Sequence, residues 1–124
     1  MRSTRLACGV VLGLVLTACG QGDQLQLKAW LGGVDSQLQL ARRYSTGDGV
    51  TRDEKEAARW YRKAAEQGSA AGQLALGARY LAGVGVQRDA VQGAEWLERA
   101  AEQGYPDAML QLAALHVRGI GVPR

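Results

Sequence analysis

Apolar and small residues recur along the chain with the spacing of amphipathic helices. Between residues 36 and 46, Leu40 and Tyr44 lie four positions apart on one stripe, and polar side chains occupy the opposite stripe. The next segment, residues 53–67, follows the i, i+3, i+4, i+7 pattern. Its apolar stripe consists of Ala57, Trp60, Tyr61, Ala64 and Ala65. This spacing predicts two helices joined by a short turn.

The same pattern returns after 36 residues. Residues 37–72 and 73–108 share 17 identities in 36 positions without a gap, and a partial third copy occupies residues 109–124. Self-similarity at a fixed period indicates a repeat array in which each unit packs on its neighbours. The sequence therefore predicts an all-α fold, a short α-solenoid of helix–turn–helix repeats.

Short polar residues and glycines mark where the predicted second helices begin and end. Asp53 and Glu56 have the spacing of a capping box, and Gly68 stands where a helix end favours a left-handed residue. The equivalents one period later are Asp89, Gln92 and Gly104. Trp60 and Trp96 are predicted to fill the core between neighbouring helices, where each indole N–H needs a partner.

A Gly-x-Gly-Val turn follows each first helix. The three turns are Gly47-Asp48-Gly49-Val50, Gly83-Val84-Gly85-Val86 and Gly119-Ile120-Gly121-Val122. A glycine-rich loop can cradle a phosphate, but such a loop follows a strand and carries a Lys-Ser/Thr pair or a further glycine. The sequence has neither, so the glycines are predicted to end one helix and swing the backbone into the next.

The segments Leu76–Tyr80, Gly83–Val86 and Ala58–Gly68 resemble the Sel-one-like repeat, a relative of the tetratricopeptide repeat. The resemblance covers residues 36–124. It implies a right-handed solenoid in which the first helices line the concave face. Many secreted members of this family carry a cysteine pair in each repeat, and this chain has none.

The first 18 residues have the composition of a bacterial secretory signal. Arg2 and Arg5 precede an apolar run, residues 6–16, that is too short to span a bilayer as a helix. The run closes on Leu-Thr-Ala-Cys at positions 16–19, which resembles the lipobox of bacterial lipoproteins. The resemblance implies cleavage before Cys19 and acylation of that cysteine. The alternative is an ordinary signal peptide with a chance cysteine near its end.

The rest of the chain divides into a tether and a repeat domain. We expect residues 1–18 to be the signal peptide, residues 19–24 a lipid-anchored tether, and residues 25–124 the repeat domain. Gly20 stands where an aspartate would retain an enteric lipoprotein in the inner membrane. Its identity favours the outer membrane within the bacterial cell envelope.

The two ends of the array are less regular than its middle. Leu25, Leu27, Trp30 and Leu31 are predicted to form a degenerate second helix that covers the first repeat, with a longer tether as the alternative. At the other end, residues 109–117 are nearly all apolar. This last helix caps the array, or is covered by a partner, or has lost a following tail.

The formal charge of +3 belongs largely to the signal peptide. Without Arg2 and Arg5 the chain has 13 basic and 12 acidic residues, a net charge near +1. The basic isoelectric point is therefore no argument for a nucleic-acid partner. Cys8 leaves with the signal and Cys19 is expected to carry lipid, so no thiol remains for a disulfide.

Candidate catalytic chemistry is sparse. His116 is the only histidine and stands where the other repeats have tyrosine, which favours a packed or surface residue over a catalyst. No cluster has metal-ligand spacing, and no serine has a histidine and an acid in a catalytic arrangement. We expect no enzyme activity, no cofactor and no metal. A hydrolase such as a β-lactamase-like enzyme, suggested by cysteine-rich members of the resembled family, has no supporting nucleophile.

Charge placement is the most informative functional signal, because the acidic residues gather in the second helices. The first helices instead carry the predicted partner-binding residues Gln39, Arg42, Arg43, Arg79, Gln111 and Arg118. A planar guanidinium suits carboxylates and phosphates. The leading interpretation is a protein or peptide partner on this face. A peptidoglycan- or glycan-binding module is the alternative, and solvated arginines without any partner remain open.

Overall fold

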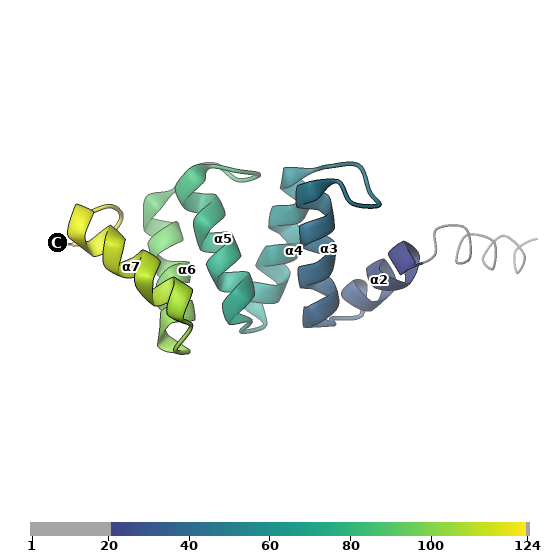
Figure 1. The fold of residues 1–124 in the computed structure, drawn as a ribbon, viewed down its shortest axis with the longest axis horizontal. Helices are drawn as coiled ribbons and strands as arrows, with labels where there is room; N and C mark the ends of the chain where they lie inside the picture. Colours follow the sequence, from purple (N-terminus) through teal and green to yellow (C-terminus); the bar gives the residue numbers. More distant parts are fainter. Residues whose placement is uncertain (1–20, 124) are drawn as a thin grey trace, which may run out of the picture.

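The computed structural model describes residues 21–123, a segment that contains six α-helices and no strand (Figure 1). The helices are α2 (Gln21–Trp30), α3 (Val34–Thr46), α4 (Glu54–Glu66), α5 (Ala70–Ala82), α6 (Ala90–Glu102) and α7 (Pro106–Arg118). The predicted all-α repeat fold is confirmed. The predicted signal peptide, Cys19 and Arg124 lie outside the described residues.

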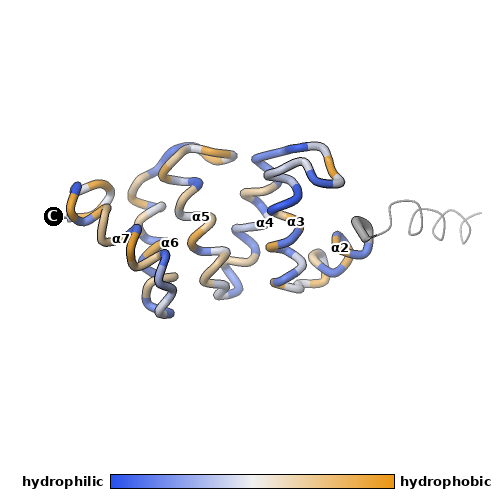
Figure 2. Tube along the Cα trace, viewed as in Figure 1, coloured by the Kyte–Doolittle hydropathy of each residue, from blue (hydrophilic) through white to orange (hydrophobic). Residues whose placement is uncertain are grey.

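The helices follow one another in a row, each packed chiefly on the helix before it and the helix after it (Figure 1). Helices α3 and α4 form the first repeat, α5 and α6 form the second, and α7 is the first helix of the third. Hydrophobic positions are denser along α5 and α7 than along α3 (Figure 2). The array therefore buries apolar surface between successive helices instead of around one central core.

The second helices begin at the predicted aspartates. Asp53 has extended backbone, and its side chain accepts hydrogen bonds from the N–H groups of Lys55 and Glu56. The Glu56 side chain does not reach back, because the Asp53 N–H instead donates to the Tyr44 carbonyl at 2.8 Å. The same arrangement recurs one period later with Asp89, Gln92 and Tyr80. The N-caps are confirmed, whereas the reciprocal capping box is replaced by a bond to the first helix of the same repeat.

The paired glycines are structural turns, as predicted. Gly83 ends α5 with a φ of +71°, a left-handed conformation that favours glycine. The second glycine has a further role, because a Cβ on Gly85 would lie 2.1 Å from the Glu54 carbonyl oxygen. A Cβ on Gly121 would likewise lie 2.3 Å from the Ala90 carbonyl oxygen. Gly85 and Gly121 thus let their turns pack against the start of the preceding second helix, whereas a Cβ on Gly49 would meet only the Arg43 side chain, at 3.8 Å.

The tryptophans lie in the core, as predicted. Trp60 is 3% exposed and Trp96 is 9% exposed, in one core cluster with the fully buried Leu40 and Leu76. The indole Nε1 of Trp60 is buried and makes no hydrogen bond within residues 21–123, contrary to the expected partner. Packing of the large ring, and not a polar contact of its N–H, therefore accounts for this position.

Two buried glutamines bind successive helices together. The Gln73 side chain, 5% exposed, donates from Nε2 to the Ala65 carbonyl and accepts from Nε2 of Gln103 at 2.9 Å. In the preceding repeat the same bonds join Gln37 to the Ala29 carbonyl and to Gln67. Each glutamine is thereby held between the second helix before it and the second helix after it.

Helix α2 covers the first repeat, but through fewer apolar residues than expected. Leu25 and Ala29 are buried against the array, whereas Leu27, Trp30 and Leu31 are 55%, 63% and 79% exposed. Helix α2 begins at Gln21, so it extends into the segment expected to be a tether. At the other end, α7 buries Ala108 and Leu115 and leaves Met109, Leu110 and Val117 exposed.

Replacing Gly85 by alanine should cost much more stability than replacing Gly68. Both glycines have positive φ, so each alanine carries a conformational cost of about 1–2 kcal/mol. A Cβ at Gly68 meets nothing within 4 Å, whereas one at Gly85 collides with Glu54. We expect the unfolding free energy to fall by about 1–2 kcal/mol in Gly68→Ala and by about 2–5 kcal/mol in Gly85→Ala. Urea unfolding measures both, and equal losses would contradict the inter-repeat contact.

The substitution Gln73→Met tests the glutamine contacts, because methionine has a similar shape and stands at the equivalent position 109. The variant loses both bonds of the Gln73 side chain, so the Ala65 carbonyl and the Gln103 amide keep only their bonds to Gly68. We expect the unfolding free energy to fall by about 1–3 kcal/mol. The exposed Gln111→Met is the control and should change it by less than about 0.5 kcal/mol. Matching results for the two variants would refute the assigned role of Gln73.

Candidate partner-binding site

Arg43 and Arg79 occupy the same position in successive repeats, and their surroundings differ. The Arg79 side chain is 12% exposed, and its Nη1 lies 2.5 Å from Oε2 of Glu54. Its Nη2 donates to the Ser45 hydroxyl at 2.9 Å, and the guanidinium lies 5.0 Å from the centre of the Tyr61 ring. The structure therefore uses this arginine to join α5 to the preceding repeat.

The ion pair affects the titration of Glu54. The hydrogen bond from Arg79 is the main cause that holds the pKa of the Glu54 carboxyl below its ordinary value. Partial burial opposes this shift, and Arg52, whose Nη2 lies 3.2 Å from Glu54 Oε1, adds to it. A lowered pKa in the folded state means that ionised Glu54 stabilises the fold, and this contribution is lost as pH falls below about 4.5.

Arg43 has no such acidic neighbour. The residue one period before Glu54 is Ala18, so the sequence offers Arg43 no equivalent carboxylate. Among residues 21–123 the ion pairs join Arg52 and Arg79 to Glu54 and Arg59 to Glu56, and none includes Arg43. The same repeat position therefore holds one arginine committed to the fold and one whose charge is available to a ligand.

Arg43 lies in a polar groove between α2 and α3, with a volume of about 250 Å³. The groove is lined by Gln24, Leu25, Lys28, Ser36, Gln39 and Arg43. Two of these side chains are cationic, two are amides, and none is acidic. Cationic and amide donors in one groove suit a ligand that carries carboxylates or other anionic oxygen groups.

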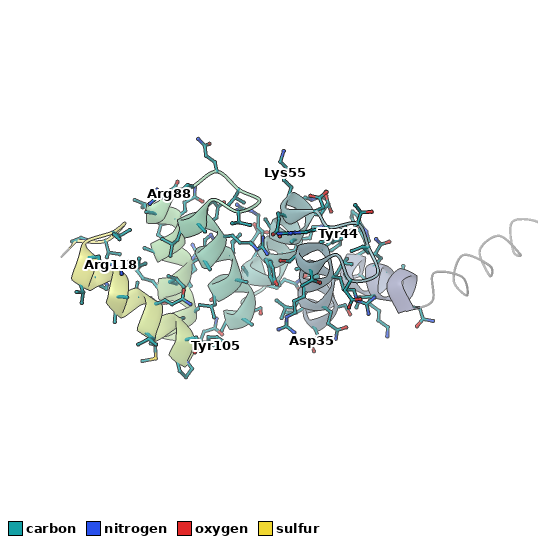
Figure 3. All side chains as sticks on the ribbon, turned by 45° about the horizontal axis from the view of Figure 1, so that its top comes forward. Asp35, Tyr44, Lys55, Arg88, Tyr105 and Arg118 are labelled. Atoms are coloured by element: carbon teal, nitrogen blue, oxygen red, sulfur yellow. The ribbon has the colours of Figure 1, made fainter. Side chains whose placement is uncertain are left out.

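The structure brings together only part of the predicted set. Gln39 and Arg43 share the groove, and the exposed Arg42 lies on the same helix. Gln111 and Arg118 are exposed on α7, and Arg118 lies at the opposite end of the array from α2 (Figure 3). The described residues thus place the predicted face in separate regions instead of one continuous surface.

Sequence reasoning missed Gln24 and Lys28. Both fall in residues 21–35, where the repeat pattern is too weak to draw attention. Extending the 36-residue register backwards aligns them with Trp60 and Ala64, two buried positions of α4. Polar residues at aligned core positions are the signal that could have located the groove.

A second groove, between α6 and α7, has a different character. It is lined by Glu98, Ala101, Glu102, Met109, Leu112, Ala113 and His116. His116 is exposed, and its Nδ1 lies 3.3 Å from the Pro123 carbonyl oxygen. Within residues 21–123 no group of three or more His, Cys, Asp or Glu side chains could hold a metal ion. The helices of this segment are also too short or too polar to cross a membrane.

Comparison with known proteins identifies the repeats. A family model described as Sel1 repeat matches residues 34–69, 70–105 and 106–124. These bounds coincide with the helix pairs α3–α4 and α5–α6 and with α7. No curated protein gives a significant match to the chain.

Solved structures of Sel1 repeat proteins are also similar to this chain. A Sel1 repeat protein from Oxalobacter formigenes is 43% identical with a TM-score of 0.73, over 80% of this chain and 74% of that one. The protective antigen c5321 of uropathogenic Escherichia coli strains, described as displaying an SLR fold, is 37% identical with a TM-score of 0.81. The match covers 90% of this chain but only 26% of the antigen. Cysteine-rich protein B of Helicobacter pylori is 30% identical with a TM-score of 0.68, over 71% of this chain and 66% of that one.

Substituting the two equivalent arginines by methionine should separate their roles. Arg79→Met removes the bonds to Glu54 and Ser45 and leaves Glu54 without its main partner. We expect it to lower the unfolding free energy at pH 7 by about 1–3 kcal/mol. Arg43→Met is the matched control and should change it by less than about 0.5 kcal/mol. The measurement is urea unfolding of both variants at several pH values.

The pH dependence of the unfolding free energy tests whether the Arg79–Glu54 ion pair causes the stability loss in Arg79→Met. Because Arg79 acts through ionised Glu54, the stability gap between the native chain and Arg79→Met should shrink as pH falls below about 4.5. A gap that stays constant from pH 7 to pH 3 would contradict the ion pair, as would an Arg43→Met variant as unstable as Arg79→Met.

Proposed function

We propose that this chain, which belongs to the Sel1 repeat family, is an envelope interaction module that binds an acidic segment of a protein partner between α2 and α3. The family match confirms the resemblance seen in the repeat motifs. Sel1 repeat proteins generally mediate protein–protein interaction and are typically non-enzymatic scaffolds. The observation that carries the proposal is the groove around Arg43, which is basic and has no acidic residue in its lining.

The groove has the donors that an acidic peptide needs. Arg43 offers a planar pair of N–H donors to a carboxylate, and Lys28 adds a second positive charge. The amide groups of Gln24 and Gln39 can both donate to and accept from a peptide backbone. Charge attraction at such an exposed groove acts over about 10 Å at 0.1 M salt, so binding weakens as salt rises.

We place the protein in the bacterial cell envelope, anchored by lipid on Cys19. The support for this location is the sequence of the first 19 residues, with its basic start, short apolar run and lipobox-like end. Gly20 favours the outer membrane over the inner membrane. An envelope location would give the groove access to acidic partners in the same compartment.

Peptidoglycan is the alternative ligand that an experiment must separate from a protein. Its peptide stems also carry carboxylates, so the chemistry of Lys28 and Arg43 would accept them. A protein partner yields a discrete covalent adduct with a photo-reactive group, whereas a cell-wall ligand retains the protein on purified sacculi. These two readouts distinguish the candidates.

The test places a photo-reactive amino acid at position 39 in intact cells and compares Arg43→Glu with Arg88→Glu. Arg88 is an exposed residue outside the groove and is the charge-matched control (Figure 3). We expect one protein adduct, reduced at least about tenfold by Arg43→Glu, since a lost charge-assisted bond costs more than about 1.4 kcal/mol. The control should retain the adduct.

Two outcomes would overturn the proposal. Equal adduct formation in Arg43→Glu and Arg88→Glu would show that the groove does not select the partner. Absence of any protein adduct, together with retention on purified sacculi, would replace the protein partner by peptidoglycan.

A further inference from the structure

Helix α2 is in register with the second helices of the array. Gly32 follows it with a φ of +94°, and Gly68 follows α4 with a φ of +93°. The Ala29 carbonyl of α2 accepts a bond from Gln37, as the Ala65 carbonyl of α4 accepts one from Gln73. Positions of α2 can therefore be compared with those of α4 and α6 residue by residue, 36 positions apart.

In this comparison, exposed apolar residues of α2 align with polar residues of α4 and α6. The exposed apolar residues of α2 are Leu27, Trp30 and Leu31, which we call the α2 patch. The aligned residues are Lys63, Glu66 and Gln67 in α4, and Arg99, Glu102 and Gln103 in α6. Charged and amide side chains stand at these positions where the array continues. At these positions the repeats have exposed Glu, Gln and Arg side chains and the half-buried Lys63, so the α2 patch places apolar residues where the repeats have polar, largely solvent-facing ones.

One residue of the α2 patch, Trp30, is held by contacts with α4. The three patch residues are spaced i, i+3, i+4, so they share one face of the helix. The Trp30 ring contacts the Trp60 ring edge-on, with centroids 5.6 Å apart, and Lys63 Nζ lies 4.3 Å from the centre of the Trp30 ring. These contacts hold the indole in place while 63% of the residue stays exposed.

The expected lipid anchor is close to the patch along the chain. One residue, Gly20, separates Cys19 from the first residue of α2. Two extended residues span at most about 7 Å, and nine helical steps from Gln21 to Trp30 add about 14 Å. An acylated Cys19 would therefore hold the α2 patch within roughly 20 Å of the bilayer surface.

We propose that the α2 patch rests on the phospholipid surface of the membrane that holds the anchor, so that the array lies against the bilayer. This inference depends on the lipid anchor of the proposed function. Tryptophan prefers the interface between headgroups and acyl chains, and leucines beside it enter the acyl boundary. Lys63, whose Nζ lies over the Trp30 ring, supplies a cation for lipid phosphates.

The test uses the full mature lipoprotein, produced with its signal peptide and reconstituted in vesicles of phosphatidylethanolamine and phosphatidylglycerol. Brominated phospholipids quench tryptophans that reach the bilayer, and the Trp30→Phe variant isolates the Trp30 contribution because Trp60 and Trp96 are buried. We expect brominated lipids to lower the emission of the native protein and to leave that of Trp30→Phe almost unchanged.

Register-matched variants test the patch itself. The double variant Leu27→Lys, Leu31→Gln gives α2 the residues that α4 has at the same positions, and it should abolish the quenching of Trp30. The control is Leu110→Gln, an equally exposed apolar residue on α7, which should leave the quenching unchanged.

Mass spectrometry of Cys19 distinguishes a failure of the proposed membrane contact from a failure of the proposed lipid anchor. Acylated protein in which Trp30 is not quenched would overturn the membrane contact and leave the anchor standing. Protein without an acyl group on Cys19 would overturn the anchor and the membrane contact together. Equal quenching in the double variant and the native chain would show that the leucines do not contribute.

Discussion

The structure depends on one packing constraint, which is that each helix must fit against the helix before it and the helix after it. Gln37 and Gln73 satisfy this constraint through hydrogen bonds to the second helices on both sides. Gly85 and Gly121 satisfy it through backbone approaches that no side chain would permit. These contacts recur every 36 residues, so they fix the register of the array and, with it, which residues share a surface.

The elements within a repeat could be predicted because their signals are local. Asp53 caps α4 and Gly83 ends α5, and each lies within a few residues of the hydrophobic pattern that predicts its helix. Contacts between repeats could not be predicted in the same way. Arg43 and Arg79 look alike in sequence, but only Arg79 has a glutamate 25 residues earlier, across the boundary between two repeats. The predicted binding face therefore contains Arg79, which forms a structural ion pair, and Arg43, which forms no ion pair within residues 21–123.

Most departures from the repeat pattern lie in helix α2. Polar residues at Gln24 and Lys28 replace a buried tryptophan and alanine, and the apolar Leu27, Trp30 and Leu31 replace charged or amide residues. The first exchange opens a basic groove, and the second creates an apolar outer face. Both proposed contacts, with an acidic partner and with the membrane, follow from α2 keeping the register of a second helix while departing from its residue types.

Amide hydrogen exchange of the protein, with and without the partner captured through position 39, tests the central claim most directly. Exchange reports protection of each segment on binding. We expect added protection in α2 and α3, around Lys28 and Arg43, and little change in α6 and α7. Protection confined to the groove between α6 and α7, with α3 unchanged, would contradict the account.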